Sequence, residues 1–240
     1  MNKNLIRELC PPLVWRTLAN IKNAAPNGAN DLALNAAVPR SPDEQDLGLY
    51  WDEKMAKLLD EWGEDNVWNE IQLLLANCHG RVLDIACGTG KTAEVLRKFA
   101  NVTVYGCDIS DFLISKAIER GIPAEHLKIC DATKSGYADD EFDYSYSIGS
   151  LEHFTEDGIR QFVAESHRIT RYASFHMLPT SRSETDEGWM KTLQSFFNNQ
   201  DSWWVERFQV CYPEVHVVPS KWEDPISHGR WFICVKDRRK

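Results

Sequence analysis

The chain has 240 residues, of which 43% are hydrophobic, and a net charge of -9 at pH 7. One α/β domain with a full hydrophobic core fits this length, and the acidic balance argues against nucleic acid as a partner, because phosphate backbones are bound chiefly by positive surface. Neither an apolar run of about 18 residues nor a basic-then-apolar N-terminus occurs, so we expect a cytoplasmic protein without a membrane span.

The first 46 residues are expected to form a helical extension and linker, separate from a main domain at residues 47–240. Short amphipathic segments at Lys3–Leu9 and Leu13–Ile21 are separated by two prolines, and a Pro- and Gly-containing linker follows. The apolar N-terminal helix is a candidate either to cover a ligand cleft or to pack on a second subunit of a homodimer. Helices are then expected near 52–62 and 67–77, where apolar residues recur three and four positions apart. Tyr50, just before them, is a candidate substrate contact.

Strand and helix patterns alternate from residue 81 onward. This alternation predicts a parallel sheet with helices on both faces. The expected strands lie near 81–86, 102–107, 126–130, 142–147 and 172–177, and the expected helices near 91–100, 111–120 and 156–169.

The first of these strands runs into a glycine turn. Gly88 and Gly90 allow a tight turn between strand and helix, so that the free N–H groups of the helix N-terminus can face a ligand. Asp108 ends the next strand, where a carboxylate can accept both hydroxyls of a ribose. The pattern therefore predicts a site for a nucleoside-containing cofactor.

Two cofactor classes use this geometry. Residues 88–93 formally satisfy the dinucleotide pattern with alanine in third place, which would indicate an NAD-dependent oxidoreductase. Asp84, however, would lie near a pyrophosphate and repel it, whereas it suits a ligand that carries an ammonium group and no phosphate. S-adenosylmethionine is such a ligand.

Motifs between residues 84 and 154 occur in the order and spacing of a known family. Residues 84–90 resemble motif I of the class I S-adenosylmethionine-dependent methyltransferases, with Ala86 in place of the usual first glycine. Residues 130–132 resemble a later motif of that family, and residues 142–154 resemble motif IV and its extension. The resemblance implies a Rossmann-like fold with a seven-stranded, mostly parallel sheet. It also implies a C-terminal antiparallel hairpin, expected at Glu214–Val218 and Arg230–Lys236, and S-adenosylmethionine as cofactor.

The same resemblance assigns the parts of the cofactor to individual positions. The resemblance assigns the methionine part of the cofactor to motif I and the ribose to the end of the second strand. It assigns the adenine to residues 130–132 and the reacting methyl to the end of the motif IV strand. The expected cofactor residues are Asp84, Ala86, Gly88, Gly90, Asp108, Ile109, Asp131, Ala132, Ser147, Ile148 and Gly149.

An alcohol acceptor needs a base, and histidine is the natural base near neutral pH. His153 and His176 both fall at expected carboxyl ends of strands, where such sheets bind ligands, although either could be a structural histidine. Glu152 and Arg182 are candidate acceptor contacts, the arginine for an anionic group. Metal-dependent relatives place an acidic residue three positions before this glutamate, but Gly149 stands here, so no metal is expected.

The acceptor is expected to be a small polar molecule. A resemblance of the N-terminal and Trp-rich C-terminal parts to enzymes of bacterial surface-polysaccharide biosynthesis points to O-methylation of a sugar, sugar nucleotide or phosphate-type group. The alternatives are N-methylation of an amino sugar or other small amine and a non-catalytic cofactor-binding protein.

Overall fold

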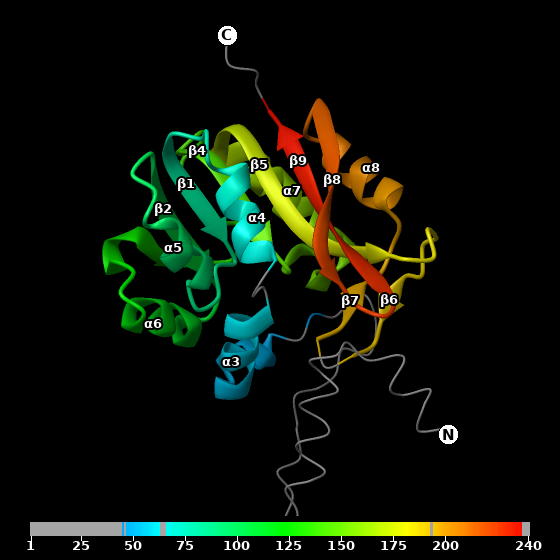
Figure 1. Ribbon diagram of the computed structural model, residues 1–240, viewed down its shortest axis with the longest axis horizontal. Helices are drawn as coiled ribbons and strands as arrows, with labels where there is room; N and C mark the ends of the chain where they lie inside the picture. Colours follow the sequence, from blue (N-terminus) through cyan, green and yellow to red (C-terminus); the bar gives the residue numbers. More distant parts are fainter. Residues whose placement is uncertain (1–44, 46, 63–65, 193, 237–240) are drawn as a thin grey trace, which may run out of the picture.

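The computed structural model describes residues 45, 47–62, 66–192 and 194–236 (Figure 1). The two short N-terminal helices expected from the sequence lie outside these residues. The domain boundary after residue 46 and the homodimer therefore stay predictions. None of the helices in these ranges combines the length and apolarity that crossing a bilayer requires.

A seven-stranded sheet with the strand order β3-β2-β1-β4-β5-β9-β8 forms the centre of the molecule. The first five strands are parallel, and β9 and β8 join antiparallel at one edge. This arrangement confirms the predicted Rossmann-like fold with its C-terminal hairpin. The strands are β1 (Gly80–Ile85), β2 (Val102–Asp108), β3 (Leu127–Ile129), β4 (Phe142–Ile148), β5 (Thr170–Ser181), β8 (Glu214–Glu223) and β9 (Ser227–Val235).

Helices cover both faces of the sheet. Successive residues of each strand point to opposite faces, and apolar strand residues are buried on both. Val82 packs with residues of α4, α5 and α6, whereas its neighbour Leu83 packs with residues of α7 and α8. The helices are α3 (Glu53–Trp62), α4 (Val67–Leu74), α5 (Lys91–Leu96), α6 (Asp111–Glu119), α7 (Glu156–Ile169) and α8 (Asp201–Gln209), with 3-10 turns η1 (Gly48–Trp51), η2 (Ala124–His126) and η3 (Leu151–His153).

The observed elements differ from the expected ones mainly in length. Strand β5 continues to Ser181 instead of ending near residue 177, and both hairpin strands are longer than expected. Pro219 lies within β8, the edge strand, where a residue without an N–H is tolerated. A separate two-stranded sheet, β6 (Trp189–Met190) and β7 (Phe196–Phe197), follows β5. It lies with α3 beyond the carboxyl ends of the parallel strands (Figure 1).

Helix α5 begins directly after Gly90, whose φ of 72° lies in the left-handed region. A Cβ at this position would approach the Cβ of Ala117 on α6 to 2.9 Å, closer than packed carbons tolerate. Gly90 therefore allows α5 to begin close against α6, and a side chain there would push the two helices apart.

We expect Gly90→Ala to lower the free energy of unfolding by about 2–4 kcal/mol, because backbone strain and a steric clash add. Gly188→Ala is the matched control: its φ is 77°, but nothing lies within 4 Å of the added Cβ, so we expect a loss of only about 1 kcal/mol from strain. Chemical denaturation of the two variants and the wild type measures both values. Equal losses would contradict the close contact between α5 and α6.

Candidate active site

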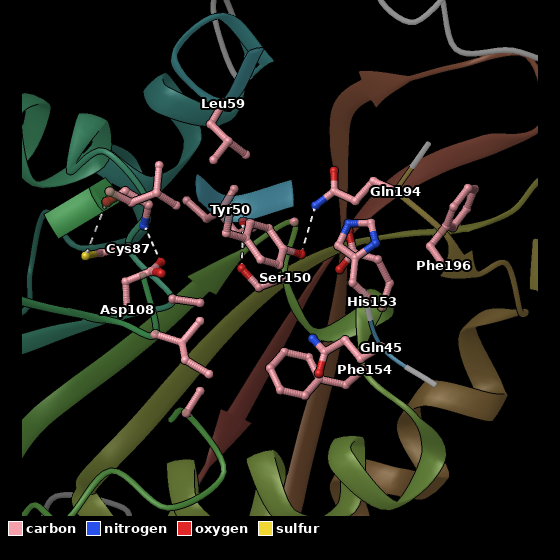
Figure 2. Close-up of a pocket in the computed structure, with 18 of the residues that line it drawn as sticks. Gln45, Tyr50, Leu59, Cys87, Asp108, Ser150, His153, Phe154, Gln194 and Phe196 are labelled. Carbon is pink, nitrogen blue, oxygen red and sulfur yellow. Dashed lines mark hydrogen bonds and ion pairs between the residues drawn. The ribbon is translucent and has the colours of Figure 1, made fainter. Parts of the chain in front are cut away.

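A cavity of about 410 Å³ opens at the carboxyl ends of β1, β2 and β4. One side, which we call the glycine-loop end, carries Cys87 and Asp108 (Figure 2). The opposite side, the histidine end, carries His153, Gln194 and Phe196, and Tyr50 and Ser150 lie between the two groups (Figure 2). The cavity therefore joins the expected cofactor loop to one of the two expected bases.

The Asp108 carboxylate organises the glycine-loop end. Its Oδ2 accepts a hydrogen bond from the Gly88 N–H, and its Oδ1 accepts one from the Ser110 N–H, both at 2.9 Å. The side chain is buried, and this burial raises its pKa while the backbone N–H groups oppose the rise. Because a carboxylate has about four acceptor sites, Asp108 retains capacity for two ribose hydroxyls.

Asp84 lies at the same end of the cavity with an unsatisfied oxygen. The side chain is buried, and its Oδ2 has no hydrogen-bond partner within the described part of the chain. Burial raises the pKa of this carboxyl well above its usual range. The side chain of Tyr146, its register partner on β4, interacts with this carboxyl and opposes the rise in pKa. A buried carboxyl oxygen without a partner fits a ligand that brings a hydrogen-bond donor, such as the ammonium of S-adenosylmethionine.

Most of the other expected cofactor residues also line the cavity, namely Ala86, Gly88, Ile109, Asp131, Ala132, Ile148 and Gly149. Gly90 and Ser147 do not. Gly90 instead serves the packing of α5 on α6, and the Ser147 hydroxyl is buried in the core, 2.8 Å from His176 Nδ1. For these two positions, we replace the expected cofactor contact with a structural role.

His153 and Glu152 meet at the histidine end, in the 3-10 turn η3. His153 Nδ1 lies 2.8 Å from the Ser195 carbonyl oxygen, and its Nε2 lies 3.6 Å from Glu152 Oε1. Burial lowers the pKa of His153 to about 4 and raises the pKa of Glu152 to about 8. At neutral pH both side chains are therefore uncharged.

His176 was the second expected base, but it lies in the core and does not line the cavity. Because β5 continues to Ser181, His176 is in the middle of the strand instead of at its end. Its ring is fully buried, stacks on Phe208 at 5.1 Å and has a pKa lowered by burial to about 3. A histidine without access to the cavity cannot take a proton from an acceptor, so we correct this prediction.

Arg182 also lies outside the cavity. Its guanidinium donates to a Glu223 carboxylate oxygen at 3.2 Å and to the Asp224 carbonyl oxygen at 3.0 Å. These contacts fix the turn between β8 and β9, so the expected role in holding an anionic acceptor is corrected as well. Tyr50 and Glu152, the other expected acceptor contacts, do line the cavity.

Segments far apart in the chain supply further lining residues that the sequence reasoning missed, among them Trp62, Phe154, Thr192, Gln194, Phe196 and Trp222. The Tyr50 hydroxyl accepts a hydrogen bond from Gln194 Nε2 at 3.2 Å, and its backbone carbonyl accepts one from Ser110 Oγ at 2.6 Å. No local motif marks these residues. An aromatic residue by itself is no signal for a site, because such residues are commonly part of the core.

Helix α3 is fastened to the glycine loop by Asp60. Its carboxylate accepts from the Arg120 guanidinium at 2.6 Å and from the Thr89 hydroxyl. The segment before the sheet thereby forms one wall of the cavity. Among the described residues, no group of three or more His, Cys, Asp or Glu side chains is arranged to hold a metal ion.

Comparison with known proteins agrees with this geometry. Residues 82–172 match the family model described as a methyltransferase domain. The O-methyltransferase cnsE of Penicillium expansum is 30% identical over 131 residues, which are 52% of this chain and 47% of that protein. Phosphoethanolamine N-methyltransferase 3 of Arabidopsis thaliana is 33% identical over 79 residues, 32% of this chain and 16% of that protein. The chain thus spans about half the length of cnsE and less of the plant enzyme.

Solved structures share the fold at low sequence identity. A methyltransferase from Aquifex aeolicus that depends on S-adenosylmethionine has a TM-score of 0.55 at 15% identity, over 77% of this chain and 99% of that chain. Haemonchus contortus phosphoethanolamine N-methyltransferase 2, solved with S-adenosylmethionine, has a TM-score of 0.56 at 15% identity, over 71% of this chain and 53% of that chain.

We expect Asp108→Asn to weaken S-adenosylmethionine binding about 10- to 100-fold, because a charged hydrogen-bond acceptor to the ribose is lost. Asp111→Asn, three residues further along on the surface of α6, is the matched control and should leave the affinity within about twofold. Calorimetric titration with S-adenosylmethionine, S-adenosylhomocysteine and NAD measures these affinities, and we expect no NAD binding. Unchanged affinity in Asp108→Asn would contradict the assignment.

Glu152 makes stability depend on pH. In the folded protein the pKa of Glu152 is about 8, above its usual value. Its contribution to the free energy of unfolding is therefore fully present below about pH 4.5 and is lost as the pH rises towards 8. We expect Glu152→Gln to be more stable than the wild type at pH 8, by about 1–4 kcal/mol, and close to it at pH 5. Denaturant unfolding at both pH values measures the difference. Glu125→Gln, at an exposed site, should follow the wild type, and a Glu152→Gln difference independent of pH would refute this.

Proposed function

We propose that this chain, in which residues 82–172 form a methyltransferase domain of the S-adenosylmethionine-dependent class, methylates a hydroxyl oxygen of a small molecule with His153 as the base. The observation that carries the proposal is that a neutral histidine lines the same cavity as the glycine loop. Methyl transfer to oxygen needs both parts in one enclosed space.

The hydrogen bond of His153 to the backbone supports this role. A carbonyl oxygen can only accept, so Nδ1 carries the proton that is donated to Ser195. The second ring nitrogen, Nε2, is then left with its lone pair and can accept a proton. Because burial keeps the ring neutral down to about pH 4, this acceptor is available throughout the physiological range.

The residues of the chain divide the work of the reaction. When bound, S-adenosylmethionine supplies an electrophilic methyl group on a sulfonium. Asp84 would hold its ammonium group and Asp108 its ribose hydroxyls, so that the cofactor would be held in one position, as methyl transfer requires. His153 Nε2 takes the proton of the acceptor hydroxyl while the new oxygen–carbon bond forms and the sulfur–carbon bond breaks. The products are a methyl ether, S-adenosylhomocysteine and a protonated imidazole, which returns its proton to solvent.

The relatives support the methyltransferase class more broadly than they support one acceptor. They include proteins named O-methyltransferase and proteins named phosphoethanolamine N-methyltransferase, and none of those described here points to surface polysaccharides. We therefore do not propose a surface glycan as the acceptor. An amine acceptor remains the second candidate, and a neutral amine would not strictly require a base.

We expect His153→Gln to lower kcat for a hydroxyl acceptor by about 10²- to 10⁴-fold, because the general base is lost. Formation of S-adenosylhomocysteine with a panel of alcohols, phenols and amines measures turnover. His216→Gln, at an exposed histidine on β8, is the control and should keep full activity, and cofactor affinity should be unchanged in both variants. Turnover that survives in His153→Gln with amines alone would favour the N-methylation alternative.

A further inference from the structure

A pair of indole rings forms an apolar wall beside the end of β4. The rings of Trp62 on α3 and Trp222 on β8 lie 5.2 Å apart, tilted by 36°. Trp62 also packs directly on Gly149, where an added Cβ would lie 3.3 Å from the indole Cη2. Because Gly149 follows the motif IV strand, the wall borders the place where the methyl group is expected to react.

Positive charge is nearly absent from the cavity. Lys91 is the only lysine or arginine among the described residues that line it, and its ammonium pairs with Glu94 at 3.6 Å on α5. Arg182 is held outside by Glu223 and the backbone. A phosphate or carboxylate is normally bound by arginine or lysine groups that face it, so the cavity lacks the means to recognise an anionic acceptor.

The acidic residues near the histidine end do not offer a site for a cation either. Asp224 Oδ1 accepts hydrogen bonds from the N–H groups of Ile226 and Ser227, at 2.9 and 2.6 Å, within its own turn. Asp157 is exposed and pairs with Arg160. Glu152 is buried and holds its proton at neutral pH. The two aspartates therefore already have partners, and Glu152, the acidic side chain next to His153, is uncharged.

We infer that the acceptor is an uncharged aromatic hydroxyl compound, whose ring packs against Trp62 and Trp222 and whose hydroxyl lies between His153 and Glu152. This inference rests on the proposed function and narrows its substrate class. A flat, uncharged ring matches the apolar wall, because aromatic rings in contact gain stabilisation beyond the area they bury.

The two polar groups at the histidine end are complementary to one hydroxyl. His153 Nε2 and Glu152 Oε1 are 3.6 Å apart, so a single oxygen can lie within about 2.8 Å of both. In addition, Glu152 Oε2 is buried without a partner among the described residues. The Glu152 carboxyl group can donate a hydrogen bond to the acceptor oxygen, and the His153 imidazole can accept one from the acceptor hydroxyl. All three groups are neutral, so the phenol binds without leaving a charge uncompensated.

The test measures binding to the full chain saturated with S-adenosylhomocysteine, by calorimetry, with 2-naphthol, phosphoethanolamine and methyl β-glucoside as probes. We expect 2-naphthol to bind at least about tenfold more tightly than the other two. Trp222→Leu should weaken 2-naphthol about tenfold, because ring contact and apolar area are lost, and should leave S-adenosylhomocysteine binding unchanged. Trp203→Leu is the control: Trp203 packs on Phe197 and Trp204, away from the cavity.

Tighter binding of phosphoethanolamine or the glucoside, no binding of 2-naphthol, or equal 2-naphthol affinity in Trp222→Leu and the wild type would each overturn the inference. Methyl transfer from S-adenosylmethionine to the same three probes is measured in parallel. Methylation of phosphoethanolamine or the glucoside alone would reject the acceptor class and retain the methyltransferase activity. Binding of S-adenosylmethionine with no transfer to any hydroxyl or amine would instead reject the proposed function itself.

Discussion

The hydrogen bonds that the Asp108 carboxylate accepts from Gly88 and Ser110 hold together the loops that follow β1 and β2. These loops belong to adjacent parallel strands, and their backbone N–H groups would otherwise lose water without gaining a partner. The same carboxylate defines the glycine-loop end of the cavity, and Ser110 in turn donates to the Tyr50 carbonyl of the segment that covers it. The buried Asp108 carboxylate thus links the cofactor loop to the loop after β2, and Ser110 extends this link to the covering segment.

Desolvation has opposite effects on the charge states of the two neighbours at the histidine end. Burial disfavours the charged form of any group, so it raises the pKa of the Glu152 carboxyl and lowers the pKa of the His153 imidazole. Both side chains become neutral without any counter-ion. Because no arginine faces them from the described lining of the cavity, this part of the site has little attraction for anionic acceptors.

The cavity is assembled from the ends of the parallel strands on one side and from segments outside the parallel strands on the other. The glycine-loop end is built by the parallel strands, which the domain shares with structures at about 15% identity. At the histidine end, η3 places Glu152 and His153, and further lining comes from the segment around β7 and from the β8–β9 hairpin, which lie outside the parallel core. Fold similarity does not identify the acceptor, which has to be argued from the lining of the cavity in this particular chain.

The C-terminal hairpin was implied by the family resemblance. The sequence by itself determined the alternation of strands and helices and the positions of Asp84, Gly88 and Asp108 at the carboxyl ends of adjacent strands. These features follow from short-range patterns, since strand ends in a parallel sheet gather at one edge whatever the rest of the chain does. Tertiary structure alone decided the histidine end. His176 has the residue type of a base, but the length of β5 and the ring of Phe208 bury it in the core. Trp62 and Trp222 meet across most of the chain, because their contact depends on how α3 and the hairpin pack, and packing between distant segments leaves no periodic signal in a single sequence.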